Sequence, residues 1–319
     1  MKKSRKPASV AAAAAIVALA GCGEREEPDV RGSGTQAAQR VAERFDPKRA
    51  FADLEAQVRL GERPAGSAAN RRLTDLLARR LKHAGLRQIG IQRPNRNVVG
   101  VIPGREPGAI VIGAHHDTKD EIPGRFVGAN DGASGVAVVL ELARALPDRV
   151  EGPSIHVALF DAEEVRGDRP FPEDGARGSA QYVRYAEAGG RQGSPRVDDI
   201  EAMVLFDLVG DCDLEIPLEE NTNTALYERF RDAALELDPE GGGGPFNGEI
   251  GGILDDHIAF AEAGVPAVDL IDFQYGPGPQ PGEWWHTDED DLDHVCAESL
   301  AAVGRPALLV LEELARAGP

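Results

Sequence analysis

The chain has 319 residues, 42% of them hydrophobic, and a formal net charge of −19 at pH 7. This length suits one large domain. So negative a surface argues against nucleic acid and anionic lipid as binding partners, and it attracts cations, including metal ions and the amino termini of peptides.

The first residues have the form of a bacterial lipoprotein signal peptide. A basic start and an Ala-rich apolar run lead to Leu19-Ala20-Gly21-Cys22, which resembles a lipobox. We therefore predict a signal peptide over residues 1–21, cleavage before Cys22 and lipidation of the Cys22 thiol. An ordinary signal peptide with a coincidental cysteine is the alternative. The protein is expected to be exported and held to a membrane, outside the cytoplasm, by this lipid anchor.

Residues 22–40 show no periodicity and are predicted to be a flexible tether, followed by a catalytic domain over residues 41–319. Within that domain, helical patterns are expected at 69–85, 134–146, 179–188, 223–237 and 297–316, with Pro306 kinking or breaking the last one. Short apolar runs that predict strands lie among them: "RQIGI", "NVVGVI", "AIVIGAHHD", "SIHVALFD", "EAMVLFDL" and "PAVDLID".

Strands that alternate with helices predict a single α/β domain, in which a mixed, mostly parallel central sheet carries helices on both faces. The Gly- and Pro-rich segments 239–252 and 274–283 are expected to be long functional loops. Cys212 and Cys296 either pair or remain buried thiols; their spacing favours neither state.

Several predicted strands end in residues that bind metals. His115 and Asp117 close one strand, Glu163 and Glu164 follow the next, and Asp207 closes a third. The last strand leads to a loop that carries His286, and Asp131 stands immediately before a helix.

Because the functional crevice of an open α/β sheet lies beyond the carboxyl ends of its strands, these side chains should meet there. A mixed set of imidazoles and carboxylates, with no cysteine, is typical of a catalytic zinc site rather than a closed structural one. We expect Glu164 to be a ligand and Glu163 to stay free as the proton carrier. Asp117 is expected to hold the second ring nitrogen of His115.

In combination, the motifs H-x-D, "GANDGASG", "FDAEE" and "WHT" resemble the zinc-dependent exopeptidase family of bacterial aminopeptidases and glutaminyl-peptide cyclotransferases. The resemblance runs from about residue 61 to the last helix and implies the zinc exopeptidase fold, which is phosphorylase/hydrolase-like. The strings "HHDTK", "LFDAEEV" and "WWHTDEDDLD" are closer to the cyclase branch.

The resemblance implies that Asp131, Glu164 and His286 hold zinc and that Glu163 is the general acid and base. It further implies that Asp207 and Asp255 form a hydrogen-bonded acidic pair and that Trp285 is a wall of the substrate pocket. The expected reaction converts an N-terminal glutamine to pyroglutamate with release of ammonia, with peptide or protein N-termini as substrates. The chain departs from the cyclase branch at Arg169, where that branch has a tryptophan, and before Trp285, where it has another aromatic residue.

An aminopeptidase is the main alternative. It would use two zinc ions that share Asp131, with His115 and Asp207 completing the second site, and the sequence favours neither one ion nor two. A third alternative is a lipid-anchored binding protein without turnover, although neither the base nor a ligand is missing. The sequence does not indicate an oligomeric state.

Overall fold

The predicted apolar runs form one six-stranded sheet in the computed structural model, which describes residues 30–317. The strands are β1 (Arg87–Ile91), β2 (Val98–Ile102), β3 (Ala109–His115), β4 (Ser154–Phe160), β5 (Ile200–Asp207) and β8 (Ala267–Ile271). Their order in the sheet is β1-β2-β4-β3-β5-β8. The pairs of β3 with β4, β3 with β5, and β5 with β8 are parallel, whereas β2 runs antiparallel to both β1 and β4. The predicted mixed sheet is confirmed.

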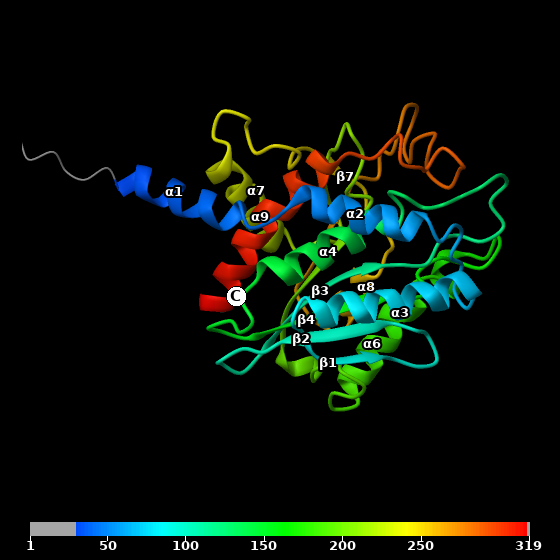
Figure 1. The fold of residues 1–319 in the computed structure, drawn as a ribbon, viewed down its shortest axis with the longest axis horizontal. Helices are drawn as coiled ribbons and strands as arrows, with labels where there is room; N and C mark the ends of the chain where they lie inside the picture. Colours follow the sequence, from blue (N-terminus) through cyan, green and yellow to red (C-terminus); the bar gives the residue numbers. More distant parts are fainter. Residues whose placement is uncertain (1–29, 318–319) are drawn as a thin grey trace, which may run out of the picture.

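Helices cover both faces of this sheet (Figure 1). Ile110 and Ile112 of β3 belong to the larger apolar core, whereas Val111 between them belongs to the smaller core on the opposite face. Both faces are therefore covered, which explains why β2, β3 and β8 are buried along their whole length and are mostly apolar instead of alternating. The larger core is built by α2 (Pro47–Val58), α3 (Ala68–His83), α4 (Ala133–Ala145), α7 (Thr224–Leu237) and α9 (Ala297–Ala317), and the smaller one by α6 (Arg177–Glu187) and α8 (His257–Glu262).

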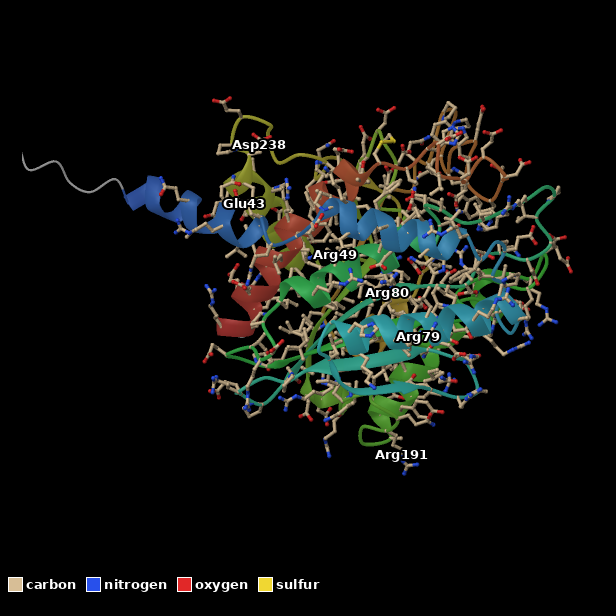
Figure 2. The ribbon with its side chains drawn as sticks, in the orientation of Figure 1. Glu43, Arg49, Arg79, Arg80, Arg191 and Asp238 are labelled. Carbon is tan, nitrogen blue, oxygen red and sulfur yellow. A yellow bond between two sulfur atoms is a disulfide. The ribbon has the colours of Figure 1, made fainter. Side chains whose placement is uncertain are left out.

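Ion pairs between helices reinforce the larger layer. Arg80 of α3 reaches Asp53 of α2 at 3.1 Å, and Arg49 of α2 donates through Nε to Glu141 of α4 at 2.8 Å. Figure 2 shows Arg49 and Arg80 close to where these three helices run side by side. Because Glu141 and Asp53 are almost fully buried, each needs such a cation to offset its desolvation.

The segment predicted to be a tether is helical over much of its length. Helix α1 (Val30–Ala42) contacts α7 and α9, and Gln39 donates to the carbonyl of Leu237 at 2.7 Å. Small residues explain the discrepancy, because Ala38 and Ala42 pack into the domain without the large apolar side chains that would mark a helical face. Residues 1–21, Cys22 and the rest of the tether up to residue 29 lie outside the described residues.

Pro306 lies inside α9 and does not end it, so the predicted break is absent. Leu308 and Leu311 on that helix are fully buried, and their packing offsets the backbone hydrogen bond that proline cannot make. The sequence did not reveal helices α2 and α8. It also did not reveal the remaining elements, which are α5 (Phe171–Asp174), a 3-10 turn (Val197–Asp199), β6 (Leu218–Glu219) and β7 (Glu249–Ile250). Between residues 30 and 317, no helix is both long and apolar enough to span a bilayer.

Candidate active site and metal centre

The strand ends bring the predicted site residues to one edge of the sheet. His115 is the last residue of β3 and Asp207 the last of β5, two neighbouring parallel strands. Glu163 and Glu164 follow β4, which pairs with β3 on its other side. The chain leaves β3 through α4 on one face and leaves β4 through α6 on the other, so a crevice forms at these carboxyl ends.

The first cluster consists of Asp131, Glu164 and His286. The His286 Nε2 atom lies 3.3 Å from an oxygen of Asp131 and 3.3 Å from an oxygen of Glu164. The three ligand atoms lie within 4.8 Å of one another, and both carboxylates are buried. The predicted zinc ligands are thus brought together.

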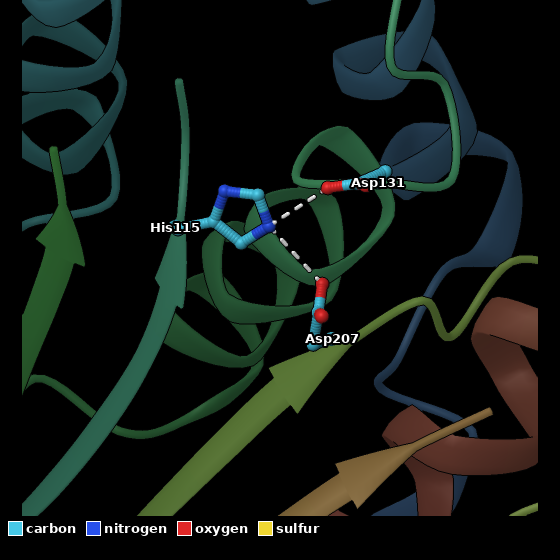
Figure 3. A group of neighbouring side chains, drawn as sticks. All are labelled: His115, Asp131 and Asp207. Carbon is cyan, nitrogen blue, oxygen red and sulfur yellow. Dashed lines mark hydrogen bonds and ion pairs between the residues drawn. The ribbon is translucent and has the colours of Figure 1, made fainter. Parts of the chain in front are cut away.

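The second cluster consists of His115, Asp131 and Asp207 (Figure 3). The His115 Nε2 atom lies 3.1 Å from Asp131 Oδ1 and 3.2 Å from Asp207 Oδ1. Asp131 therefore turns Oδ1 toward His115 and Oδ2 toward His286, which places one carboxylate between the two clusters. This is the arrangement expected for the alternative second metal site.

Both clusters fit zinc. Tetrahedral ligands about 2.0–2.1 Å from a zinc ion are about 3.3 Å apart, which matches the separations of 3.1 to 3.3 Å between imidazole nitrogens and carboxylate oxygens. The buried Glu164 Oε1 atom is the oxygen that faces His286 Nε2 at 3.3 Å, and among the described residues it makes no hydrogen bond. A buried carboxylate oxygen without a donor needs a cation or a proton.

The electrostatics of the two clusters also suit the binding of a cation. Although burial lowers the pKa of His286, Glu164 and Asp131 raise it to about 10. Burial likewise opposes the charge on His115, but Asp207, Asp117 and Asp131 raise its pKa well above the usual range. Burial and repulsion by Asp131 raise the pKa of Glu164 to about 7. The carboxylates thus exceed the available positive charge.

Glu163 lies beside these ligands but belongs to neither cluster. It lines the same pocket as Glu164 and is 8% exposed. Burial raises its pKa well above the usual range of a glutamic acid, with Asp255 and Glu164 adding to the effect and His115 opposing it. A carboxyl group with a raised pKa next to a metal site can both accept and return a proton.

Asp117 holds the turn after β4 instead of orienting His115. Its carboxylate accepts hydrogen bonds from the backbone N–H groups of Glu163 at 3.1 Å and Glu164 at 3.3 Å. The distance from its Oδ1 to His115 Nδ1 is 3.8 Å, which is too long for a hydrogen bond. The expected hydrogen bond from the His115 ring to the Asp117 carboxylate is therefore absent, and the attraction between these groups is electrostatic. Asp161, the first carboxylate after β4, also has a structural role, accepting from Asn70 and from the N–H of Arg96.

The clusters open into a pocket of about 560 Å³ that receives side chains from all the site's loops. Trp285 lines it and stacks on His286, with ring centroids 3.7 Å apart and an interplanar angle of 16°. Other lining residues include Val165, Arg169, Phe171, Ile253, Leu254 and Phe273. Arg169, which stands where the cyclase branch has a tryptophan, therefore contributes to the wall of the pocket.

Asp207 and Asp255 both line this pocket, whereas Asp256 is fully buried and does not. Within the described residues no hydrogen bond joins the Asp207 and Asp255 carboxyl groups, so the expected bonded pair is not formed. Burial and repulsion by Asp207 raise the pKa of Asp255 to about 7. Asp255 also belongs to a third buried group with His257 and Asp269, in which His257 lies 3.6 Å from Asp269 and 3.2 Å from the neighbouring Glu219.

Two further features near the site were not predicted. Cys212 and Cys296 form a disulfide, a question that the sequence left open. Arg63 and Asp290 are fully buried and bind the backbone of the loop that carries Asp131. Asp290 stands four residues after His286 in an acidic run, which resembles a solvated surface segment, so its burial had no signal in the sequence.

The fold and the two clusters define a protein of the zinc exopeptidase type. The chain belongs to peptidase family M28, whose model matches residues 97–311. The expected family, fold and zinc cofactor are confirmed, as is the expectation of an enzyme at the level of the family.

Relatives and solved structures include both cyclases and peptidases. The chain is 29% identical to aminopeptidase YwaD of Bacillus subtilis, covering 68% of this chain and 42% of that protein. It is also 29% identical to the glutaminyl-peptide cyclotransferase of Drosophila melanogaster, covering 68% and 65% respectively. It therefore spans less than two thirds of either relative.

Two solved structures match over most of both chains. A glutaminyl cyclase from an Acidobacteriales bacterium is 26% identical with a TM-score of 0.72, covering 85% of this chain and 95% of that one. A Zn-dependent exopeptidase from Parabacteroides distasonis is 26% identical with a TM-score of 0.71, covering 84% and 98%.

Proposed function

We propose that the protein is a zinc-dependent enzyme that acts on peptide N-termini and cyclises N-terminal glutamine to pyroglutamate. The observation that carries the proposal is Glu163, a buried carboxyl group outside the ligand set that lines the same pocket as Asp131, Glu164 and His286. The similarity to a solved bacterial glutaminyl cyclase across 85% of the chain supports this choice of reaction.

In this reaction the protein's own groups bind the substrate and move one proton. When bound to Asp131, Glu164 and His286, zinc supplies a positive charge that polarises the carbonyl of the glutamine side-chain amide. Glu163 takes a proton from the substrate's α-amine, and the amine nitrogen forms a bond to the amide carbon. The bond between that carbon and the amide nitrogen breaks, and Glu163 returns the proton to the departing ammonia. Trp285 forms an apolar wall that keeps water from the glutamine side chain.

An aminopeptidase is the second candidate, and one observation favours it. Asp131 faces both histidines with separate oxygens, as a carboxylate shared by two metal ions would. In that reaction Glu163 would take the proton from an attacking water molecule instead of from the substrate's amine. The similarity to aminopeptidase YwaD supports this candidate.

One pair of assays on purified protein distinguishes the candidates. A peptide that begins with glutamine and the aminoacyl amides of leucine and alanine are incubated with the zinc-loaded protein, and ammonia and free amino acid are followed separately. Release of ammonia from the glutamine peptide alone supports the cyclase. Free amino acid from the ordinary substrates supports the aminopeptidase, and the absence of both products contradicts an enzyme of either kind.

We further propose that the protein is exported and anchored to a membrane through a lipid on Cys22. The leader sequence supports this location, and so does the disulfide between Cys212 and Cys296, because disulfides persist in oxidising compartments. Mass spectrometry of the membrane-bound protein tests the proposal, which requires a diacylated N-terminal cysteine at position 22. An unmodified N-terminus contradicts it.

A further inference from the structure

The loop 127–131, which ends in the shared carboxylate Asp131, is bound on two sides by buried ions of opposite charge. Asp290 binds its N–H groups and Arg63 binds its carbonyl groups. Neither ion belongs to the two metal clusters or lines the pocket. Both side chains are nevertheless fully buried, so the fold tolerates two desolvated charges at this place.

Asp290 accepts hydrogen bonds from the ligand loop with both carboxylate oxygens. Oδ1 accepts from the N–H of Asn130 at 2.7 Å and from the hydroxyl of Tyr275 at 3.0 Å, and Oδ2 accepts from the N–H of Asp131 at 3.0 Å. The backbone carbonyl of Asp290 also accepts from the N–H of Ala129 at 3.3 Å. Three successive N–H groups of the loop are thus satisfied by one residue.

Arg63 binds the preceding part of the same loop. Its guanidinium group donates to the carbonyls of Val127 and Gly128, the latter at 3.0 Å. A third carbonyl, that of Gly61, accepts at 3.2 Å, and the backbone N–H of Arg63 donates to Thr118 at 2.8 Å. A planar guanidinium group with several donors suits this task, whereas an ammonium group would not reach two neighbouring carbonyls in one plane.

Asp290 also connects the ligand loop to the loop that carries His286. Its N–H donates to the carbonyl of Thr287 at 3.3 Å, and Thr287 donates through its hydroxyl to the carbonyl of Trp284 at 2.8 Å. Asp131 and His286, two ligands of one cluster, are therefore linked through Asp290 without any metal. The bonds from Asp290 to Thr287 are neutral, whereas those that its carboxylate accepts from Asn130 and Asp131 are charge-assisted and about twice as strong.

We propose that Arg63 and Asp290 are positioning residues: they hold the loop so that the Asp131 carboxylate is already placed to bind zinc before the metal arrives. The inference rests on the zinc site of the proposed function but not on which reaction the enzyme catalyses. If Arg63 and Asp290 only stabilised the fold, their loss would lower the melting temperature and leave the zinc affinity of the folded protein unchanged.

The test compares zinc affinity with thermal stability in the purified protein. Zinc dissociation constants are measured by competition with a chromogenic chelator, and melting temperatures by calorimetry, for Asp290→Asn and Arg63→Lys. Asparagine has one acceptor oxygen in place of two, so it can keep only part of the bonds to Asn130 and Asp131. We expect Asp290→Asn to weaken zinc binding about 10–100-fold, as is typical for groups that orient metal ligands, and Arg63→Lys to weaken it less.

Glu141→Gln is the matched control. Glu141 is a fully buried carboxylate that also binds a backbone N–H, that of Asp46 at 3.0 Å, and the guanidinium groups of Arg49 and Arg144. We expect it to lower the melting temperature without changing zinc affinity. The proposal is overturned if Glu141→Gln and Asp290→Asn weaken zinc binding equally, or if Asp290→Asn binds zinc as tightly as the unmodified protein.

A second measurement needs no variant and decides the matter if the variants do not fold. Hydrogen exchange of the Asn130 and Asp131 amides is compared in the zinc-loaded and zinc-free unmodified protein. Because Asp290 already accepts from both amides, we expect them to stay protected after zinc is removed. Free exchange of these two amides in the zinc-free protein, while the amides of β3 remain protected, would show that the metal and not Asp290 orders the loop.

Discussion

Asp131 presents one carboxylate oxygen to each histidine of the site, Oδ2 to His286 and Oδ1 to His115. The other ligands each belong to a single cluster: Glu164 and His286 to the first, and Asp207 to the second with His115. Because only Asp131 is shared, removing either histidine should empty one cluster and leave the other with all its ligands. Single substitutions of the two histidines can therefore show whether the protein binds one metal ion or two.

His286→Ala should reduce bound zinc, because its cluster would keep only two of its three protein ligands. His115→Ala should leave that first zinc in place and remove a second ion only if the protein binds two. Zinc per protein chain, measured by elemental mass spectrometry after gel filtration, checks both variants. Full zinc occupancy in His286→Ala would show that the assignment of ligands is wrong.

Glu163→Gln should keep zinc and lose turnover. Glutamine has nearly the same volume as glutamic acid, so the pocket and the neighbouring Glu164 should be undisturbed, but its amide cannot carry the proton. Removal of a general acid or base typically costs about 10²–10⁴-fold in rate, and Glu163 serves both proton transfers in the proposed reaction. The measurement is kcat on the glutamine peptide together with zinc content, and unchanged kcat would exclude Glu163 from the mechanism.

At the scale of elements, the apolar runs predicted all six strands of the central sheet, because strands buried on both faces are mostly apolar; β1 at the edge of the sheet is the exception, being exposed to half-buried. Helices with few large apolar residues, such as α1, had too weak a pattern to be found. The metal ligands could be predicted because their motifs stand at the ends of strands, and these ends converge at one edge of the sheet. The sequence predicted that Asp117 binds the His115 ring, whereas its hydrogen bonds come from the N–H groups of Glu163 and Glu164. A sequence cannot tell whether a carboxylate binds a ring nitrogen or two nearby amides.

The disulfide is an element-scale constraint whose loss should be costly. It joins Cys212, five residues after the end of β5, to Cys296, the residue immediately before α9, and the two are 84 residues apart in sequence. Closing a loop of this length removes chain entropy from the unfolded state worth about 4–5 kcal/mol at 25 °C in the chain-entropy model, and losses of 2–5 kcal/mol are typical.

The double variant Cys212→Ser/Cys296→Ser should therefore unfold at a clearly lower urea concentration than the oxidised protein. The control is the unmodified protein in excess reductant, which should match the variant because Cys212 is exposed and accessible to the reductant. Equal urea midpoints for the oxidised protein and the double variant would mean that the disulfide contributes nothing to stability.

For the whole molecule, the net charge of −19 does not show that several of the acids are buried together. Asp255, Asp256, Asp269 and Glu219 are all buried within one region, with His257 among them. Burial raises the pKa of Asp255 to about 7 and those of Asp256 and Asp269 well above their usual range. Groups of this kind take up protons on folding, so they favour the folded state as the pH falls toward the acid range.

His156, far from the metal ligands at the start of β4, has the opposite dependence on pH. Burial lowers its pKa from 6.5 to about 4. The unfolded chain therefore takes up a proton on His156 at a higher pH than the folded protein, and the stability that depends on neutral His156 is present above pH 6.5 and lost as the pH falls toward 4. Between pH 7 and pH 5 the loss should be about 1–2 kcal/mol.

His156→Gln, which cannot titrate, should remove this part of the pH dependence, measured as the difference in unfolding free energy between variant and unmodified protein at each pH. The same substitution at the exposed His83 is the control for the change of residue type. A constant difference between His156→Gln and the unmodified protein from pH 7 to pH 5 would show that His156 titrates alike in the folded and unfolded states.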